Sequence, residues 1–248
     1  MQINPDIQAY LQGDKFSAGL EIPIQKTRYL PQTRIEIILK IVQHKSVIHV
    51  GCTDHLEIID RKIDEDKWLH KLLTDQCDEV FGIDLNEESI RYVQEELGYR
   101  NLRRGDIISD DFPEIKSRTW DYSLFGELVE HLDNPVAFLS AFREKYQDHV
   151  DRFIITVPNI LNKARFKQMK SYREIINTDH RFWFTPYTIS KLITEAGMSP
   201  EKIYYGNLIP LNFTQLVLRK IKRILGLPVR YPYLYFNSLI VVGKLSND

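Results

Sequence analysis

Glutamate and histidine side chains are grouped in the segment Glu-Leu-Val-Glu-His-Leu, which begins at Glu127. Glu127, Glu130 and His131 are spaced i, i+3 and i+4, and in a helical turn these positions share one face. Two carboxylates and an imidazole would therefore converge, and such a group can move a proton or hold a substrate by hydrogen bonds. His180 is a fourth candidate, remote in the sequence but just ahead of a helix that leads back to the predicted sheet.

A glycine and an aspartate end two apolar runs nearer the N-terminus. The runs Ser46-Val-Ile-His-Val and Val80-Phe-Gly-Ile are bounded by polar residues and end in turns, as buried parallel strands do. The carboxyl ends of neighbouring parallel strands line one crevice, so we expect Gly51 and Asp84 on the same rim. Glycine allows a tight turn close to a ligand, and a carboxylate can accept hydrogen bonds from both hydroxyls of a ribose. The pair predicts a nucleoside site.

A nicotinamide dehydrogenase is the rival interpretation of a glycine turn followed by an aspartate. Its fingerprint needs three glycines, so that the backbone can approach a pyrophosphate, and its acidic residue follows roughly 20 residues further on. Here the second and third glycines are missing, and Asp84 lies much farther from Gly51. These differences disfavour a dehydrogenase.

Strand-like and helical segments alternate along the part of the chain that must position these residues. The pattern predicts strands over 46–50, 80–84, 101–105, 120–125 and 153–157, and helices over 33–43, 66–77, 87–97, 135–146 and 185–197. Alternation of this kind predicts βαβ units and a parallel sheet, and therefore an α/β fold.

Two further strands are expected near the C-terminus, over 203–205 and 238–242. An insertion at about 208–234 separates them and is longer than an ordinary hairpin connection. We therefore expect one domain over 35–248 that carries this insertion, preceded by a leader over 1–34 that packs on it.

Composition favours a single domain in a reducing compartment. The 248 residues are 43% hydrophobic, enough to bury a full core, and their net charge of −1 indicates no general attraction to nucleic acid or membranes. Cys52 and Cys77 form neither a metal-type pair nor a disulfide framework. No run approaches the roughly 18 apolar residues of a membrane span, and the N-terminal residues lack a signal-peptide pattern, so a cytoplasmic location is expected.

The order of these motifs resembles the class I S-adenosylmethionine-dependent methyltransferases. The matching features are Gly51 after the first strand, Asp84 ending the second, Gly-Asp-Ile107 after the third, the Glu-Leu-Val-Glu-His-Leu block after the fourth and Thr-Val-Pro-Asn159 after the fifth. The resemblance covers roughly residues 35 to 245. It implies a Rossmann-like sheet of seven strands with helices on both faces and the last strand antiparallel.

The resemblance also implies which residues bind S-adenosylmethionine. Asp84 and Asp106 would hold the ribose and the adenine, and the first glutamate of the block would line the methionine end. The implied set is His49, Gly51, Cys52, Asp84, Leu85, Asp106, Ile107 and Glu127.

The first turn departs from the family. An acidic residue usually stands in place of His49, and further glycines stand in place of Thr53 and His55, so the bulkier turn would narrow the pocket. Some bacterial methyltransferases from glycan-related contexts carry a similar Gly-Cys-x-Asp-His turn. The alternative is a methyltransferase-like fold that no longer binds cofactor.

A Glu-x-x-Glu-His motif with a distant histidine resembles the set that binds a divalent ion in the ubiquinone-pathway O-methyltransferases and in the small-RNA 2′-O-methyltransferases. The corresponding residues here are Glu127, Glu130, His131 and His180. Oxygen and imidazole ligands suit Mg²⁺, Mn²⁺ or Zn²⁺. Other relatives carry the motif without a metal, so a catalytic role for His131, His180 and Glu130 as metal-free acid–base or hydrogen-bonding groups is the alternative.

These features together predict an S-adenosylmethionine-dependent methyltransferase that modifies a hydroxyl of a sugar, glycan intermediate or small metabolite. The alternatives are an RNA 2′-O-methyltransferase, with RNA the less favoured partner, and a non-catalytic binding protein with the same fold. A basic surface stripe continuous with the insertion would favour RNA, and failure to bind cofactor would favour the non-catalytic protein.

The insertion contains a basic amphipathic segment over 212–226. Its apolar residues fall mainly on one helical side, and its lysines and arginines lie largely elsewhere. Such a helix can lie on an anionic membrane surface or bind a phosphate-bearing substrate. It can also simply pack on its own domain with its charges in water.

Overall fold

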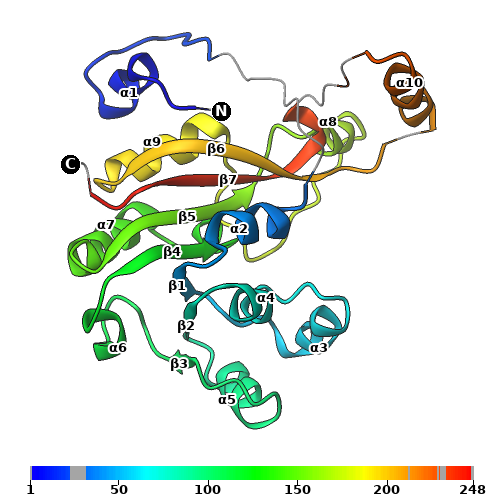
Figure 1. The fold of residues 1–248 in the computed structure, drawn as a ribbon. Helices are drawn as coiled ribbons and strands as arrows, with labels where there is room; N and C mark the ends of the chain where they lie inside the picture. The colour runs from blue at the N-terminus through cyan, green and yellow to red at the C-terminus, as the bar shows by residue number, and fades with distance from the viewer. Residues whose placement is uncertain (1, 23–31, 212, 228, 230–232, 247–248) are drawn as a thin grey trace.

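The computed structural model of the protein describes residues 2–22, 32–211, 213–227, 229 and 233–246. These residues form one seven-stranded sheet in the order β3-β2-β1-β4-β5-β7-β6 (Figure 1). The strands are β1 (Ser46–Val50), β2 (Glu79–Asp84), β3 (Leu102–Arg104), β4 (Trp120–Gly126), β5 (Val150–Pro158), β6 (Ser199–Leu208) and β7 (Phe236–Lys244). Strands β1 to β5 pair in parallel, and β7 runs antiparallel to both β5 and β6. The predicted Rossmann-like sheet with its antiparallel last strand is confirmed.

Helices cover both faces of this sheet, and two of the α-helices named below bury no side chain among the described residues. They are α1 (Pro5–Gln12), α2 (Arg34–Val42), α3 (Leu56–Asp64), α4 (Leu69–Gln76), α5 (Glu87–Glu95), α6 (Pro113–Lys116), α7 (Pro135–Tyr146), α8 (Lys163–Lys170), α9 (Pro186–Glu195) and α10 (Phe213–Ile224), with short 3-10 helices η1 (Val129–His131) and η2 (Tyr233–Tyr235). Within the described ranges, no helix is long and apolar enough to cross a membrane.

The helices that feed the site begin at strong local signals. Thr33 caps α2 in a reciprocal capping box with Glu36, and Asn134 caps α7 just ahead of a proline at the first helical position. Such caps satisfy backbone donors that a helix leaves without partners. The helix predicted over 66–77 begins later, at Leu69, because the chain turns at Asp66 with a φ of +50° and closes a separate helix, α3, before it.

Adjacent residues of the central strands pack on opposite faces of the sheet. Leu124 and Ile154 belong to the core beneath α2 and α4, whereas Phe125 and Ile155 belong to the larger core that includes side chains of α7 and α9. All four side chains are fully buried. Burial of this kind stabilises the fold by about 1.5–3 kcal/mol for each such side chain. Two buried faces explain why these strands are nearly continuous apolar runs.

The described part of the N-terminal leader lies against the C-terminal half of the domain. Leu11 of α1 is buried, and its carbonyl accepts a hydrogen bond from Lys191 of α9 at 2.6 Å. Ile3 donates from its backbone to Glu201 at 3.0 Å, so the leader also reaches the β6 edge of the sheet. Residue 1 and residues 23–31 of the leader lie outside the described residues, as do residues 212, 228 and 230–232 of the insertion.

Candidate active site

A cleft of about 740 Å³ opens at the carboxyl ends of the parallel strands. Four residues at these strand ends line it: Gly51 follows β1, Asp84 ends β2, and Asp106 and Glu127 follow β3 and β4. Its size lies within the usual range of small-molecule sites, roughly 300–1,000 Å³. The bulkier first turn, which was expected to narrow the pocket, therefore leaves room for a ligand.

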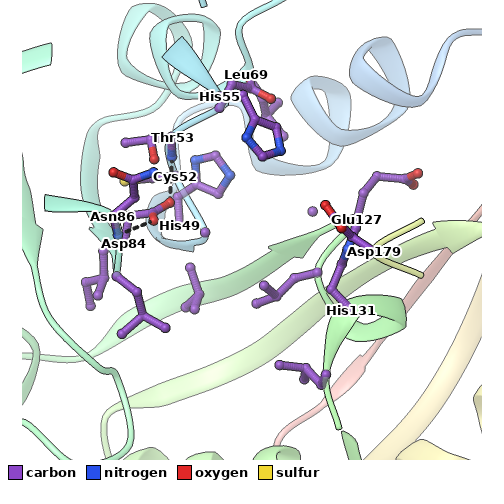
Figure 2. A pocket seen from close by; sticks show the side chains of 18 of the residues that line it. His49, Cys52, Thr53, His55, Leu69, Asp84, Asn86, Glu127, His131 and Asp179 are labelled. Atoms are coloured by element: carbon purple, nitrogen blue, oxygen red, sulfur yellow. Dashed lines mark hydrogen bonds between the residues drawn. The ribbon is translucent and has the colours of Figure 1, made fainter. Parts of the chain in front are cut away.

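The turn after β1 holds the Asp84 carboxylate in place. Gly51 has a φ of +71°, a left-handed conformation that glycine adopts without steric cost, and its N–H donates to the Ile83 carbonyl at 2.8 Å. The backbone N–H groups of Thr53 and Asn86 donate to the two Asp84 carboxylate oxygens, at 2.9 Å and 3.0 Å (Figure 2). Because a carboxylate has about four acceptor positions, Asp84 keeps capacity for a ligand's hydroxyl groups.

His49 lies at the base of the cleft and is stacked on His70 of α4. The two ring centroids are 5.5 Å apart, and the two Nδ1 atoms approach to 3.3 Å. Both rings are buried. Burial lowers the pKa of His49 well below its usual range, with further lowering by His70 and Arg34, and burial lowers the pKa of His70 to about 4. Both imidazoles are therefore neutral at pH 7, and one Nδ1–H can donate to the other Nδ1.

Glu127 is held in a strained backbone conformation beside Arg34. Its φ is +57°, which is uncommon for a residue other than glycine and costs about 1–3 kcal/mol. Its N–H donates to the carbonyl and hydroxyl oxygens of Thr156, both at 3.0 Å, and its carboxylate lies 3.9 Å from Arg34 Nε. Arg34 also donates to the Thr156 hydroxyl at 3.1 Å. Strain of this kind persists where surrounding contacts fix a functional group.

Glu130, His131 and His180 converge at the other end of the cleft. One ligand atom from each lies within 4.8 Å of the others, and the two imidazole rings meet edge to face with centroids 4.6 Å apart. Arg181 fastens the two chain segments together, because its backbone N–H donates to the Glu130 carbonyl and its guanidinium binds the His131 carbonyl and Asp133.

Buried polar atoms in this cluster lack partners. Among the described residues, neither Glu130 carboxylate oxygen nor His180 Nδ1 has a hydrogen-bond partner. Burial, followed by the charge of Glu127, raises the pKa of Glu130 to about 8. Burial and the neighbouring His131 lower the pKa of His180. Buried polar groups without partners are rare, and a ligand or ion that satisfies them is a usual explanation.

Comparison with known proteins identifies the fold. No protein-family model and no curated protein matches the sequence. A structure of an S-adenosylmethionine-dependent methyltransferase from Archaeoglobus fulgidus aligns over 85% of this chain and 91% of its own, with 18% identity and a TM-score of 0.53. A Bacillus halodurans protein assigned as a methyltransferase aligns over 86% and 99%, with 14% identity and a TM-score of 0.51.

The small RNA methyltransferase HEN1 is also similar, with 16% identity and a TM-score of 0.52. The alignment covers 93% of this chain but 27% of the HEN1 chain. The similarity to these structures, the strand order and the antiparallel β7 all indicate the same fold. The chain has the class I methyltransferase fold.

The methyltransferase fold brings the residues of the expected cofactor set to one cleft. Every member of that set lines the cleft: His49, Gly51, Cys52, Asp84, Leu85, Asp106, Ile107 and Glu127. Figure 2 shows Asp84, Asn86 and Thr53 on one side of the cleft and Glu127 and His131 on the other. His131 and His180 also line the cleft, and the fully buried Glu130 lies behind them.

Glu127 does not lie in the cluster in which the metal-binding resemblance placed it with Glu130, His131 and His180. Within the described ranges, the group that could hold a metal ion contains Glu130, His131 and His180, and Glu127 is not part of it. The reason is local, since η1 begins at Val129 and the left-handed backbone at Glu127 precedes it. The i, i+3 and i+4 positions therefore do not belong to one regular helical turn.

Two residues with candidate roles in the site were not predicted from the sequence. Arg34 lines the cleft from the first turn of α2 and contacts Glu127, and His70 supports His49 from α4. Neither lies in a motif. Only the capped start of α2 marks the neighbourhood of Arg34, and a capping box predicts a helix rather than a site.

Proposed function

We propose that this protein is an S-adenosylmethionine-dependent O-methyltransferase that acts on a hydroxyl of a sugar, glycan intermediate or small metabolite. The observation that carries the proposal is that His131 and His180, clustered with the buried Glu130, line the same cleft as Gly51 and Asp84. In a methyltransferase fold, this arrangement sets acid–base groups opposite a nucleoside site.

The residues of the cleft fit the cofactor. The Asp84 carboxylate, fixed by two backbone N–H groups, is suited to accept hydrogen bonds from the ribose hydroxyls. Asp106, Ile107 and Glu127 line the same cleft, and in this proposal Asp106 and Ile107 would contact the adenine and Glu127 the methionine end. When bound, S-adenosylmethionine supplies a methyl group already activated on a sulfonium sulfur.

Orientation and proton removal are the tasks left to the protein. Because the pKa of His180 is lowered, its imidazole is neutral at pH 7 and can accept the proton of an acceptor hydroxyl. The bound cofactor would supply its methyl group to the acceptor oxygen and leave as S-adenosylhomocysteine, while the His180 imidazole would take the hydroxyl proton. Arg181 and the edge-to-face contact with His131 hold the ring in place for this transfer.

The same three residues fit a divalent metal ion. A carboxylate and two imidazoles form a donor set suited to Mg²⁺, Mn²⁺ or Zn²⁺, and the Glu130 oxygens and His180 Nδ1 have no protein partner among the described residues. A bound ion would lower the pKa of an acceptor hydroxyl. Glu130, His131 and His180 would hold it, and Glu127 would remain with Arg34.

A ribose 2′-hydroxyl of RNA is the second candidate acceptor. It is favoured by the likeness to the small RNA methyltransferase HEN1 and requires the same hydroxyl chemistry. The net charge of −1 favours a small-molecule or glycan acceptor, whereas the basic residues of α8 and α10 form a surface of the kind on which RNA binding relies.

Calorimetric titration with S-adenosylmethionine and S-adenosylhomocysteine tests the proposal first. We expect saturable binding of both, followed by methyl transfer to at least one compound in a screen of sugars, glycan fragments and short RNAs. Absence of binding by the folded protein would identify a non-catalytic relative. Transfer to RNA alone would replace the glycan or small-molecule acceptor with the ribose hydroxyl.

A further inference from the structure

Helix α10 lies on the protein with its polar side inward. Gln215 and Arg219, one turn apart, are its half-buried residues, and every other residue of the helix is exposed. Gln215 donates to the Tyr235 hydroxyl at 2.9 Å, and the Arg219 guanidinium lies 5.3 Å from the centre of the Tyr235 ring. This orientation differs from that of an ordinary surface helix, which turns its apolar side toward the core.

The apolar side of α10 therefore faces solvent. Phe213, Val217, Ile221 and Ile224 follow helical spacing and lie opposite Gln215 and Arg219 on the helix. Phe213 is 80% exposed and Ile224 is 75% exposed. Within the described ranges, no residue of α10 is buried. A contiguous apolar stripe left in water usually marks an interaction surface.

Helix α8 contacts the same tyrosine ring, that of Tyr235, as the polar side of α10. Lys163 of α8 lies 5.4 Å from the centre of the Tyr235 ring, so the tyrosine that contacts Arg219 joins the two helices. Figure 1 shows α8 and α10 at the same end of the molecule, with α10 outermost. Phe166 and Met169 of α8 are exposed, as is Ile224 of α10. We call the exposed side chains of α8 and α10 the α8–α10 face.

The charge of this face is positive throughout. No acidic residue lies between Glu201 and Asp248, and α8 contains none. On α10, Lys220 is exposed beside the apolar stripe, whereas Lys222, also exposed, lies farther round the helix toward the side of Gln215. The net charge of the whole chain is −1, so acidic residues elsewhere offset the positive charge of this face.

An anionic lipid surface fits this combination better than a second protein. Protein interfaces are depleted in lysine, whereas helices that lie on membranes combine a Leu- and Phe-rich side with lysine and arginine beside it. Lysine side chains can extend their ammonium groups to lipid phosphates while their methylene groups stay in the apolar layer. With 12 residues, α10 is shorter than the roughly 20 residues needed to cross a bilayer.

We propose that the α8–α10 face docks on the surface of an anionic bilayer. The stripe of Phe213, Val217, Ile221 and Ile224 enters the boundary between headgroups and acyl chains, and the exposed ammonium groups of Lys220 and Lys222 extend to lipid phosphates. Docking needs no rearrangement of α10, because its apolar side already faces outward. This inference does not depend on the proposed enzymatic reaction.

Sedimentation with vesicles tests the docking. Vesicles of equal parts phosphatidylglycerol and phosphatidylcholine are expected to bind the full chain, and binding should weaken as salt is added. The variant Lys220→Glu with Lys222→Glu should lower the partition coefficient on the order of tenfold or more. Ile221→Asp with Ile224→Asp should lower it similarly; because both side chains are exposed, circular dichroism should remain unchanged.

A charge-matched control separates docking from net charge. Lys40→Glu with Arg100→Glu changes the total charge equally at exposed positions outside α8 and α10, and should bind vesicles as the parent protein does. Equal sedimentation of parent and both α10 variants overturns the proposal, as does failure of the parent to bind. If sedimentation equilibrium instead shows a dimer that Ile221→Asp dissociates, the face is an interface between two copies of this chain.

Discussion

His131 and His180 meet edge to face, with ring centroids 4.6 Å apart, although they belong to segments that follow different strands. His131 ends η1 after β4, and His180 lies in the loop between α8 and α9, after β5. Arg181 joins these segments by its hydrogen bonds to Glu130 and His131. The contact depends on the order of strands in the sheet, and it sets two imidazoles beside the buried Glu130 carboxyl.

If Glu130, His131 and His180 hold a divalent ion, as proposed, the ion should stabilise the folded protein. A ligand that binds only the folded state stabilises it by about 2.7 kcal/mol at a hundredfold excess over Kd. We therefore expect Mg²⁺, Mn²⁺ or Zn²⁺ to raise the melting temperature of the parent protein in a thermal denaturation experiment. The variants His180→Ala and Glu130→Gln should not respond. Turnover should stop with EDTA and return with the ion.

His55→Ala is the matched control for the metal experiment. His55 lines the same cleft but is not among the three clustered residues, so its removal should leave the response to metal intact. If neither ions nor EDTA have an effect while His131→Ala and His180→Ala are both inactive, the cluster acts as a metal-free acid–base or positioning site.

Replacing Asp84 should weaken cofactor binding more than any change at the far side of the cleft. On the proposed ribose assignment, Asp84→Ala would remove two charge-assisted hydrogen bonds to the ligand, so we expect a loss of about 2–4 kcal/mol in S-adenosylhomocysteine binding by calorimetry. The loss of the bonds from Thr53 and Asn86 also loosens the turn, so the fold must be checked by circular dichroism. Asp64→Ala, an exposed position, serves as the control. Unchanged affinity in a folded Asp84→Ala protein contradicts the ribose assignment.

Arg34 should act on the cofactor through Glu127. Arg34→Met removes the guanidinium that contacts Glu127 and Thr156 but keeps much of the side-chain volume. Coupled residues in one network show interaction energies of about 0.5–3 kcal/mol. A double-mutant cycle with Glu127→Gln, read from S-adenosylhomocysteine affinity, should therefore be non-additive. Strictly additive losses would show that the two residues act independently.

Much of the fold could be predicted because its signals are local. Short apolar runs bounded by polar residues located the strands, and apolar residues at helical spacing located the long helices. The short helices were missed for physical reasons. Helix α8 buries none of its residues among the described ranges, so it lacks the apolar stripe that periodicity detects, and α6 spans one turn.

Residues that line the cleft could be predicted from the sequence where they lie at the ends of strands. Those that reach the cleft from other elements could not. Gly51, Asp84 and Asp106 lie at strand termini, which topology gathers at one edge of the sheet. Arg34 reaches the cleft from a helix start, and its role follows from its contact with Glu127, which no spacing encodes. The displacement of Glu127 from the metal-type cluster has a similar origin, since a single left-handed residue is set by its surroundings.

The buried pair of His49 and His70 should make the protein sensitive to mild acid. Both imidazoles have lowered pKa values when folded, with that of His70 about 4, whereas an unfolded histidine has a pKa of about 6.5. Between these values the unfolded chain binds more protons than the folded one, so stability is fully present above pH 6.5 and falls as the pH drops toward 4. His70→Gln keeps a polar partner for His49 but removes one titrating group, so it should lose about 2 kcal/mol less stability than the parent between pH 7 and pH 5. Urea denaturation at the two pH values measures this difference, with the exposed His44→Gln as the matched control. Equal losses in the parent and in His70→Gln would mean that His70 is not held neutral in the folded protein.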